Sequence, residues 1–414
     1  MSYENKILQM KKMLGKKTET KQQKPAFIKP DVPNYIGTWK QAGLTLVEND
    51  FGVLFKRVVT YPLTYRHGHY ELQELFDAIG LWEQSEEHPY AVTSDETLVF
   101  FDTETTGLKG VGTHIFLLGF LETDGEEFTL TQYVLADPSN EAALLFESKL
   151  WQRTATIVSY NGKSFDWPQL ETRWTLNQAY IPKLRQQKQI DLLHSTKRLW
   201  KNDLEKMKLT TIEQEKLGFQ RVGDIPGFLA PIIYLDAVKS GQADALMKVL
   251  HHNEWDLLSL VTLYIHSTQL LFQKEISDSA VTYTNIGKWY NDLKQKNTGI
   301  NVLTTVTEHF DITDTGLAHF YLAMEQKRAC QYEQAAKSLI KALPAIDIPF
   351  QIRAYEQLAI IAEHHLRDYE EAKVYTQTGL QLISSHEKWS SLQKEKQFSK
   401  WEKRLHRITN KLNK

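Results

Sequence analysis

A short apolar run that ends in two carboxylates constrains this chain more than any other feature. It lies in LVFFDTETTGL, residues 98–108. The apolar residues 98–101 predict a buried strand, and side chains two apart on a strand share a face, so Asp102 and Glu104 project together. Neighbouring carboxylates repel each other unless a cation lies between them, and their oxygen atoms suit Mg²⁺ or Mn²⁺ better than zinc. A solvent-exposed strand end is the alternative for this pair taken alone.

Two further motifs carry chemistry of the same kind. SYNGKSFDWPQL, residues 159–170, places Asp166 between two aromatic residues; as an alternative, Asp166 caps a helix that has Pro168 in its first turn. LHHNEWDLLSL, residues 250–260, places His252 and Asp256 four residues apart, hence on one face of a helix. An ordinary surface pair is the alternative for this last motif.

Composition excludes several classes of protein. A length of 414 residues predicts roughly two to three domains, and 42% hydrophobic with 24% charged residues is typical of a soluble globular protein. No apolar run approaches the ~18 residues of a membrane span, and the start has no signal-peptide pattern, so we expect a cytoplasmic protein without a membrane partner. The single cysteine, Cys330, rules out an internal disulfide and fits a reducing compartment.

Charge alone does not indicate a nucleic-acid partner. The formal net charge is −2, so phosphate contacts require local clusters of Lys and Arg. Three basic clusters are present, in the first 32 residues, between residues 183 and 208, and from residue 394 to the end. For each cluster a solvated face or a disordered end is the alternative.

The chain changes character along its length. Residues 97–135 predict three consecutive strands in an antiparallel meander, and strands then alternate with helices, which indicates a mixed α/β sheet. The predicted parts are a flexible basic tail (1–32), a small strand-containing N-terminal segment (33–95), the α/β domain (96–275), a connector (276–310), helical repeats (311–385) and a basic C-terminal helix (386–414).

The predicted repeats rest on an internal similarity. YEQAAKSLIKAL begins at Tyr332 and YEEAKVYTQTGL begins at Tyr369, and both place alanine three residues later. Helix pairs of this kind are typical of tetratricopeptide repeats, whose period is ~34 residues. Such pairs build concave surfaces, which predicts a protein partner; a stabilising lid on the α/β domain is the alternative.

In combination, the three carboxylate motifs resemble those of the DEDD exonucleases, the superfamily that includes the DnaQ-type proofreading nucleases. DTETTG is similar to the first motif of that superfamily, and YNGKSFDWP is similar to the second motif in proofreading domains of B-family DNA polymerases. With its tetratricopeptide-like C-terminal region, the chain resembles the YprB-type ribonuclease H-like proteins of bacteria.

This resemblance implies a fold and an activity. The fold would be an α/β ribonuclease H-like domain, a mixed five-stranded sheet flanked by helices, followed by an all-α helical-repeat region. Asp102, Glu104, Asp166 and Asp256 would be catalytic and hold two divalent cations, Mg²⁺ or Mn²⁺, for two-metal hydrolysis of phosphodiesters. The implied activity is a 3′–5′ exonuclease that acts on single-stranded 3′ ends of DNA or RNA.

The resemblance also implies a general base just before the last carboxylate, where the superfamily has tyrosine or histidine. His252 stands at the tyrosine position and His251 at the histidine position. The polymerase-like second motif favours His252 as the base, with His251 as the alternative. Histidine suits this role because imidazole ordinarily titrates near neutral pH.

Four further residues are predicted to bind substrate, namely Thr105, Asn161, Phe165 and Arg221. For Asn161 the alternative is that it holds its own turn, and for Arg221 it is a structural ion pair with Asp224. Two other functions stay open, a non-catalytic adaptor for nucleic acid or protein with a degenerate nuclease core, and a ribonuclease H-like endonuclease.

Overall fold

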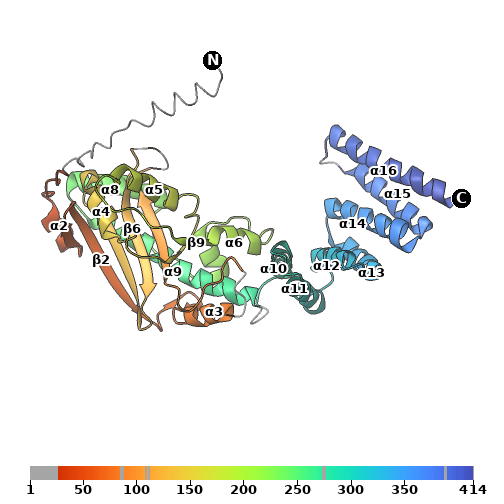
Figure 1. Ribbon diagram of the computed structural model, residues 1–414, viewed down its shortest axis with the longest axis horizontal. Coiled ribbons are helices and arrows are strands. Elements are labelled where there is room, and N and C mark those ends of the chain that lie inside the picture. The colour runs from red at the N-terminus through yellow and green to blue at the C-terminus, as the bar shows by residue number, and fades with distance from the viewer. Residues whose placement is uncertain are drawn as a thin grey trace, which may run out of the picture. The chain divides into compact units, whose positions relative to one another are not determined.

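The computed structural model describes residues 27–83, 88–107, 110, 112–272, 277–386 and 389–413 (Figure 1). Most of the predicted basic tail therefore lies outside the described residues. The chain forms two compact units. The first contains residues up to 64, 96–190 and 221–258, and the second contains residues 65–95, 191–220 and 259 onward.

One mixed sheet is the centre of the first unit, with the strand order β1-β2-β7-β6-β5-β8-β9. Its strands are β1 (Thr45–Asn49), β2 (Gly52–Pro62), β5 (Leu98–Thr105), β6 (Ile115–Thr123), β7 (Glu127–Leu135), β8 (Thr156–Ser159) and β9 (Lys188–Asp191). β5, β6 and β7 pair antiparallel in sequence, while β5 and β8 run parallel. The predicted meander and the mixed sheet are confirmed.

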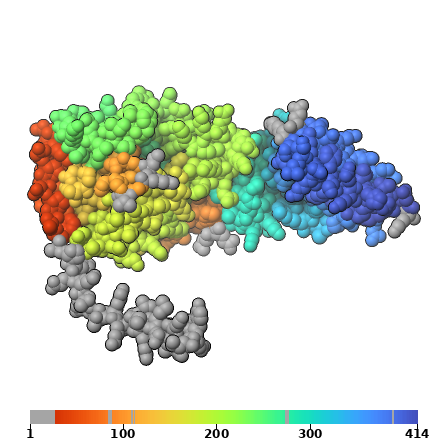
Figure 2. All heavy atoms as spheres, turned by 90° about the horizontal axis from the view of Figure 1, so that it is seen from above, coloured from red at the N-terminus to blue at the C-terminus, as the bar shows by residue number. Residues whose placement is uncertain are grey.

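The predicted α/β domain contributes five strands, β5 to β9, and in the described part of the chain the sheet has seven because β1 and β2 of the N-terminal segment join it. β1 and β2 form a hairpin, and β2 pairs antiparallel with β7 from Leu54↔Leu135 to Pro62↔Glu127. The segment that the sequence showed only as strand-containing thus extends the sheet at one edge, coloured red to orange in Figures 1 and 2. Phe55 is fully buried there and contacts Trp39 at 4.8 Å between ring centroids, so the added edge also adds apolar core.

Helices cover both faces of this sheet. They are α2 (Ile36–Gln41), α4 (Glu141–Glu147), α5 (Asp166–Asn177), α8 (Ala230–Ser240) and α9 (Asp244–Leu271), with 3₁₀ turns η1 (Pro138–Asn140) and η3 (Gly227–Leu229). Phe101 of β5 contacts Trp167 of α5, and the neighbouring Asp102 accepts a hydrogen bond from Asn253 of α9. Because adjacent strand residues point to opposite faces, α5 and α9 lie on opposite sides of β5.

A glycine permits the close approach of α9 to the sheet. A Cβ atom on Gly119 of β6 would lie 2.3 Å from Asn253 Oδ1 and 2.8 Å from Leu257 Cδ1. No side chain fits in that space, so the helix can bring its polar residues against the strands only because residue 119 is glycine.

The second unit is mainly helical, and its elements follow in chain order. They are β3 (Arg66–His67), β4 (Tyr70–Glu71), α3 (Glu74–Trp82), α6 (Leu192–Leu199), α7 (Leu209–Ile212), the π-helical turn η2 (Glu213–Leu217), α10 (Ala280–Asp292), α11 (Lys296–His309), α12 (Gly316–Arg328), α13 (Tyr332–Ala342), η4 (Leu343–Ala345), α14 (Ile348–Ile361), the π-helical turn η5 (Ala362–Leu366), α15 (Tyr369–Ser385) and α16 (Ser391–Leu412). The predicted all-helical C-terminal region is confirmed. The stretch predicted as a connector contains α10 and α11. Among the helices that the structure describes, none has the length and apolarity needed to cross a membrane.

The aligned repeat residues occupy equivalent places. Tyr332 begins α13 and Tyr369 begins α15, and Ala335 and Ala372 are both fully buried. Alanine at these positions lets neighbouring helices approach, because a larger side chain would have no space in a close-packed interior.

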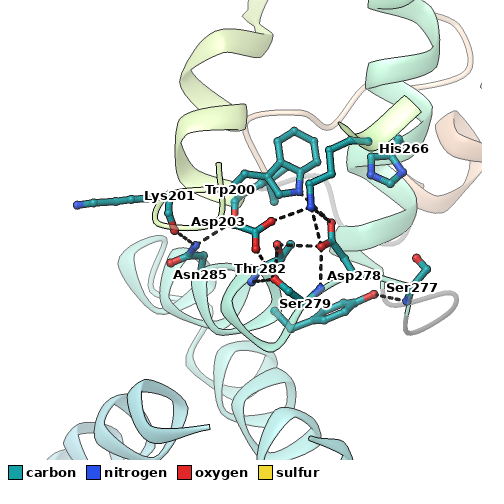
Figure 3. A network of polar contacts seen from close by, with 12 residues as sticks. Trp200, Lys201, Asp203, His266, Ser277, Asp278, Ser279, Thr282 and Asn285 are labelled. Atoms are coloured by element: carbon teal, nitrogen blue, oxygen red, sulfur yellow. Dashed lines mark hydrogen bonds and ion pairs between the residues drawn. The ribbon is translucent and has the colours of Figure 1, made fainter. Parts of the chain in front are cut away.

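A half-buried ion cluster connects the loops of the second unit (Figure 3). Lys216 Nζ donates to Asp203 Oδ2 at 2.7 Å and to Asp278 Oδ1 at 2.9 Å, and Trp200 Nε1 donates to Asp278 Oδ2 at 2.9 Å. Ser279 Oγ donates to Asp203 Oδ1 at 2.9 Å and also caps α10. The ammonium group therefore joins the end of α6, the η2 turn and the start of α10.

Two buried histidines predict an acid-sensitive second unit. Burial, with a contribution from Arg198, lowers the pKa of His88 to about 3, and burial lowers the pKa of His266 to about 4. Both are neutral in the native state but take up a proton near pH 6.5 when unfolded, so their contribution is complete above that pH and is lost as pH falls toward 4. Each should reduce the free energy of unfolding by about 1.4 kcal/mol per pH unit in this interval.

Urea unfolding between pH 7 and 4.5 tests this dependence in the intact chain. In His266→Gln the free energy of unfolding should decrease less steeply with falling pH than in the unsubstituted chain, by the contribution of one bound proton. The comparison cancels the carboxylates that titrate in both proteins. Equal slopes in the two proteins would show that His266 does not cause the acid sensitivity.

Candidate metal centre

The carboxyl-terminal end of β5 presents two half-buried carboxylates. Burial, followed by the negative charges of Asp256 and Asp166, raises the pKa of Asp102 well above its usual value. The same causes, with Asp224 as a further neighbour, raise the pKa of Glu104. Carboxylates from β5, α5 and α9 are therefore close enough to oppose one another's ionisation, which is the electrostatic environment that a bound cation relieves.

A tight turn brings Asp166 to this site. Asn161 has a left-handed backbone with φ 67°, and its carbonyl oxygen accepts from the amides of Ser164 and Phe165, each at 3.1 Å. α5 then begins at Asp166, whose carboxylate accepts a hydrogen bond from the hydroxyl of Thr103 on β5. Asn161 is exposed and holds this turn through its backbone, which is the alternative that the sequence left open for it.

Helix α9 contributes His252 and Asp256, as the spacing predicted. Single ligand atoms of Glu104, His252 and Asp256 all lie within 4.8 Å of one another, and His252 Nε2 is 3.6 Å from Asp256 Oδ2. The structure brings these three together as a group that could hold a cation. Asp102 and Asp166 adjoin it electrostatically and are not part of that group.

Asp224 fixes the orientation of His252. Its two carboxylate oxygens lie 2.8 and 2.9 Å from His252 Nδ1. A carboxylate at this distance accepts a hydrogen, so Nδ1 carries the proton and Nε2 keeps a free lone pair. His252 can therefore accept a proton or bind a metal ion through Nε2.

Arg221 lies among the carboxylates. Its Nη2 donates to Asp256 Oδ1 at 2.5 Å and its Nη1 donates to Asp224 Oδ2 at 3.2 Å, and its side chain is only 6% exposed. The predicted alternative, an ion pair with Asp224, is present. Arg221 thus offsets part of the negative charge that the acidic residues concentrate here.

The neighbouring histidine faces a different set of residues. His251 Nδ1 lies 3.2 Å from Glu254 Oε2, and half of the His251 side chain is exposed. Glu254 in turn pairs with Arg57 of β2 at 2.6 Å. Consecutive helix positions diverge by about 100°, so only His252 joins Glu104 and Asp256.

The remaining predicted residues lie nearby in the chain. Thr105 is buried at the end of β5, and its hydroxyl donates to the carbonyl oxygen of Gly107 at 2.9 Å. Phe165 is half-buried and directly precedes Asp166. The Thr105 hydroxyl thus supports the local backbone.

Two residues that the sequence did not single out hold Asp102 in place. Asn253 Nδ2 donates to Asp102 Oδ2 at 2.8 Å, and Gln132 Nε2 of β7 donates to Asn253 Oδ1 at 2.8 Å. Arg57 donates to Gln132 Oε1 at 2.8 Å, so the orientations of both amides are determined. Gln132 and Asn253 are fully buried. Asn253 lies three residues before Asp256 and could have been found from helical spacing. No motif in the sequence around Gln132 indicates a role at the site.

Comparison with known families agrees with this geometry. A family model described as RNase_H superfamily matches residues 99–268, the range that contains β5, α5 and most of α9. The sheet, its flanking helices and the carboxylate site thus define a nuclease-type domain of the ribonuclease H superfamily.

One relative extends this relationship beyond the matched domain. The chain is 36% identical over 385 residues to the uncharacterized protein YprB of Bacillus subtilis (strain 168), across 90% of this chain and 92% of that protein. The chain belongs to the YprB family of ribonuclease H-like proteins.

The residues at the site fit divalent cations. Ribonuclease H-like domains generally use such ions, and the donors here are the carboxylate oxygens of Glu104 and Asp256 with one ring nitrogen of His252. Carboxylate oxygens are the ligands that Mg²⁺ and Mn²⁺ prefer. The raised pKa values of Asp102 and Glu104 show that these acids ionise only at a cost when nothing positive is bound. Arg221 meets part of that cost through one oxygen of Asp256.

Proposed function

We propose that this protein is a metal-dependent 3′–5′ exonuclease that hydrolyses phosphodiester bonds of DNA or RNA. The observation that carries the proposal is the mutual electrostatic coupling of Asp102, Glu104, Asp166 and Asp256 at one end of the sheet. The exonuclease direction rests on the resemblance of the three motifs to the DEDD exonucleases.

In the proposed mechanism Asp102, Glu104, Asp166 and Asp256 would hold two divalent cations. When bound, these ions would supply positive charge for the phosphodiester and acidify a water molecule. His252 then accepts the proton of that water at Nε2, because Asp224 occupies Nδ1. Arg221 places a guanidinium beside Asp256, where it can stabilise negative charge on the phosphate.

A non-catalytic adaptor is the second candidate, and one contact favours it. The guanidinium of Arg221 lies 2.5 Å from Asp256, so a built-in cation already neutralises one of the acids. A degenerate nuclease core could keep its fold in this way without metal. Against it, all four acidic positions retain a carboxylate.

A digestion panel tests the activity. The intact chain is incubated with Mg²⁺, Mn²⁺ or EDTA on 5′-labelled single- and double-stranded DNA, RNA and hybrids, with a blocked 3′ end as a control. We expect a metal-dependent ladder of products shortened from the 3′ end, which the block abolishes. Internal cuts that ignore the block would indicate an endonuclease, and no cleavage with any metal would favour the adaptor.

The helical region supports a separate proposal, that it binds a protein partner in the cytoplasm. Its support is the equivalent placement of Ala335 and Ala372 in α13 and α15. Removal of residues 311–414 distinguishes a partner surface from a lid. A partner surface predicts unchanged melting of the remainder, whereas a lower melting temperature would favour the lid.

Asn253→Ala tests how the site is organised. The loss of its hydrogen bond to Asp102 is expected to weaken Mn²⁺ binding about 10- to 100-fold, which is typical when a residue that hydrogen-bonds to a metal ligand is removed. One N–H of the buried Gln132 amide would also lose its acceptor, which should cost about 1–3 kcal/mol of stability, while the other keeps its bond to the carbonyl oxygen of Leu250. Calorimetric titration with Mn²⁺ measures the first effect and urea unfolding the second. Unaltered Mn²⁺ affinity would mean that Asn253 does not position a metal ligand.

A further inference from the structure

A hollow of about 760 Å³ runs along one side of α5 in the first unit. One wall is a single helical face that includes Trp167, Glu171, Trp174 and Gln178. The other wall is the segment 183–189, which leads into β9. Trp167 directly follows Asp166 in the chain, so the helical wall begins one residue after the carboxylate of α5 and extends for about 16 Å of helix.

The charge of this hollow is suited to an anionic strand. Lys183 and Arg185 line it and are exposed, and within the described part of the chain neither forms an ion pair. Glu171 is the acid in the lining, and it accepts a hydrogen bond from Trp167 Nε1 at 3.1 Å. Two cations thus line the hollow, and both belong to the basic cluster of residues 183–208.

The wall that carries these cations is held in place. Gln187 Oε1 accepts from the amide of Ala155 at 2.7 Å, and Gln187 Nε2 donates to the carbonyl oxygen of Arg153 at 2.9 Å. Trp174 Nε1 donates to the carbonyl oxygen of Pro182 at 2.7 Å, which fixes the start of the segment against α5. The side chains of Lys183 and Arg185 therefore extend from a backbone segment that does not need to reorganise when a phosphate binds.

We propose that this hollow binds the phosphate backbone of a single nucleic-acid strand whose end lies at the carboxylate site. Lys183 and Arg185 make the phosphate contacts, and the side-chain amides of Gln186 and Gln189 supply hydrogen bonds without a preference for one base. Sites of roughly 300–1,000 Å³ enclose a drug-sized molecule, so the hollow suits about one or two nucleotides of a strand. The inference rests on the proposed nuclease function and specifies its substrate path.

Lys188 provides a matched control in the same segment. Its ammonium group pairs with Glu96 at 2.9 Å, and the residue is not part of the lining. The comparison is between Lys183→Ala/Arg185→Ala and Lys188→Ala in the full chain. Binding of a fluorescent 12-nucleotide single strand is measured by anisotropy in EDTA, where cleavage cannot occur, over a range of salt concentrations.

The double variant is expected to bind about tenfold more weakly at low salt. Its plot of log K against log salt should be shallower by about 1.4, since each phosphate contact on a single strand contributes about 0.7. Lys188→Ala should stay within about twofold of the unsubstituted chain. Unchanged affinity of the double variant, or no binding of the strand by the unsubstituted chain, would overturn the proposal.

Hydrolysis of bis(p-nitrophenyl) phosphate with Mn²⁺ separates this proposal from the nuclease function. This small diester is too short to reach Lys183 or Arg185, so the double variant should hydrolyse it at the unsubstituted rate. Retained hydrolysis together with retained strand binding would refute the hollow and leave the nuclease standing. In the opposite case, the unsubstituted chain hydrolyses neither oligonucleotides nor this diester, and the double variant binds the strand more weakly. That result would refute the nuclease function and leave the hollow as a strand-binding site.

Discussion

Replacement of Asp102 by asparagine is expected to lower the rate of phosphodiester hydrolysis by at least about a thousandfold. Charge stabilisation by a bound metal contributes several kcal/mol to the transition state, and about 4 kcal/mol corresponds to this factor. Asparagine has the same shape and can still meet the amide of Asn253, so the loss would reflect the missing charge and not a collapsed site. Initial rates with Mn²⁺ on the best substrate of the digestion panel measure it.

The same substitution should stabilise the metal-free protein. Burial and neighbouring acids raise the pKa of Asp102 above its unfolded value, so at pH 7 its ionisation opposes folding. Without that charge, the melting temperature in EDTA should rise. Added Mg²⁺ should stabilise the unsubstituted chain and have little effect on the variant, because a ligand stabilises only the state that binds it.

Asp236→Asn is the matched control for both measurements. Asp236 is an exposed carboxylate on α8 in the same unit, and its replacement should change neither the rate nor the response to Mg²⁺. If Asp102→Asn keeps its activity, or if Mg²⁺ stabilises both proteins equally, then Asp102 is not a metal ligand.

His252→Ala is expected to reduce kcat by about 10²- to 10⁴-fold, the range for loss of a general base. Its imidazole lies near Glu104 and Asp256 and has Nε2 available, because Asp224 accepts the hydrogen of Nδ1. His251→Ala is the adjacent control and should change kcat by less than about twofold, since His251 contacts Glu254 instead. A larger loss from His251→Ala would reverse the assignment.

The pH dependence separates two roles for His252. If it acts as the base, the variant should lose the acidic limb of its pH–rate profile while its affinity for Mn²⁺ is retained. If it is a metal ligand, affinity for Mn²⁺ should fall and excess metal should restore part of the rate. Titration of activity with Mn²⁺ at several pH values measures both.

Much of the fold was predictable because the relevant signals are local. The apolar run before Asp102 and the glycine-punctuated segments after it predicted β5 to β7, and the paired antiparallel registers confirm them. The attachment of β1 and β2 was not predictable. It depends on pairs such as Phe55↔Val134, which lie far apart in the chain, and an alternating strand pattern does not indicate its partner.

The candidate site shows the same division. Spacing alone places His252 and Asp256 on one helical face, and the resemblance of the second motif favoured His252 over His251. The packing of α9 against β6, which Gly119 permits, brings His252 to Glu104 of β5, whereas His251 pairs with Glu254 of its own helix. The support of Asp102 by Gln132 through Asn253 likewise arises from packing between β7 and α9.

Residue chemistry and short-range periodicity were therefore sufficient to name the strand that carries the acids, the helix that carries His252 and the class of ion they suit. Long-range contacts had to supply the seven-stranded sheet, the meeting of His252 with Glu104 and the buried amides behind Asp102. The physical reason is that periodicity defines only which side chains share a face. Which faces meet, and at what rotation, is settled by packing among residues distant in the chain.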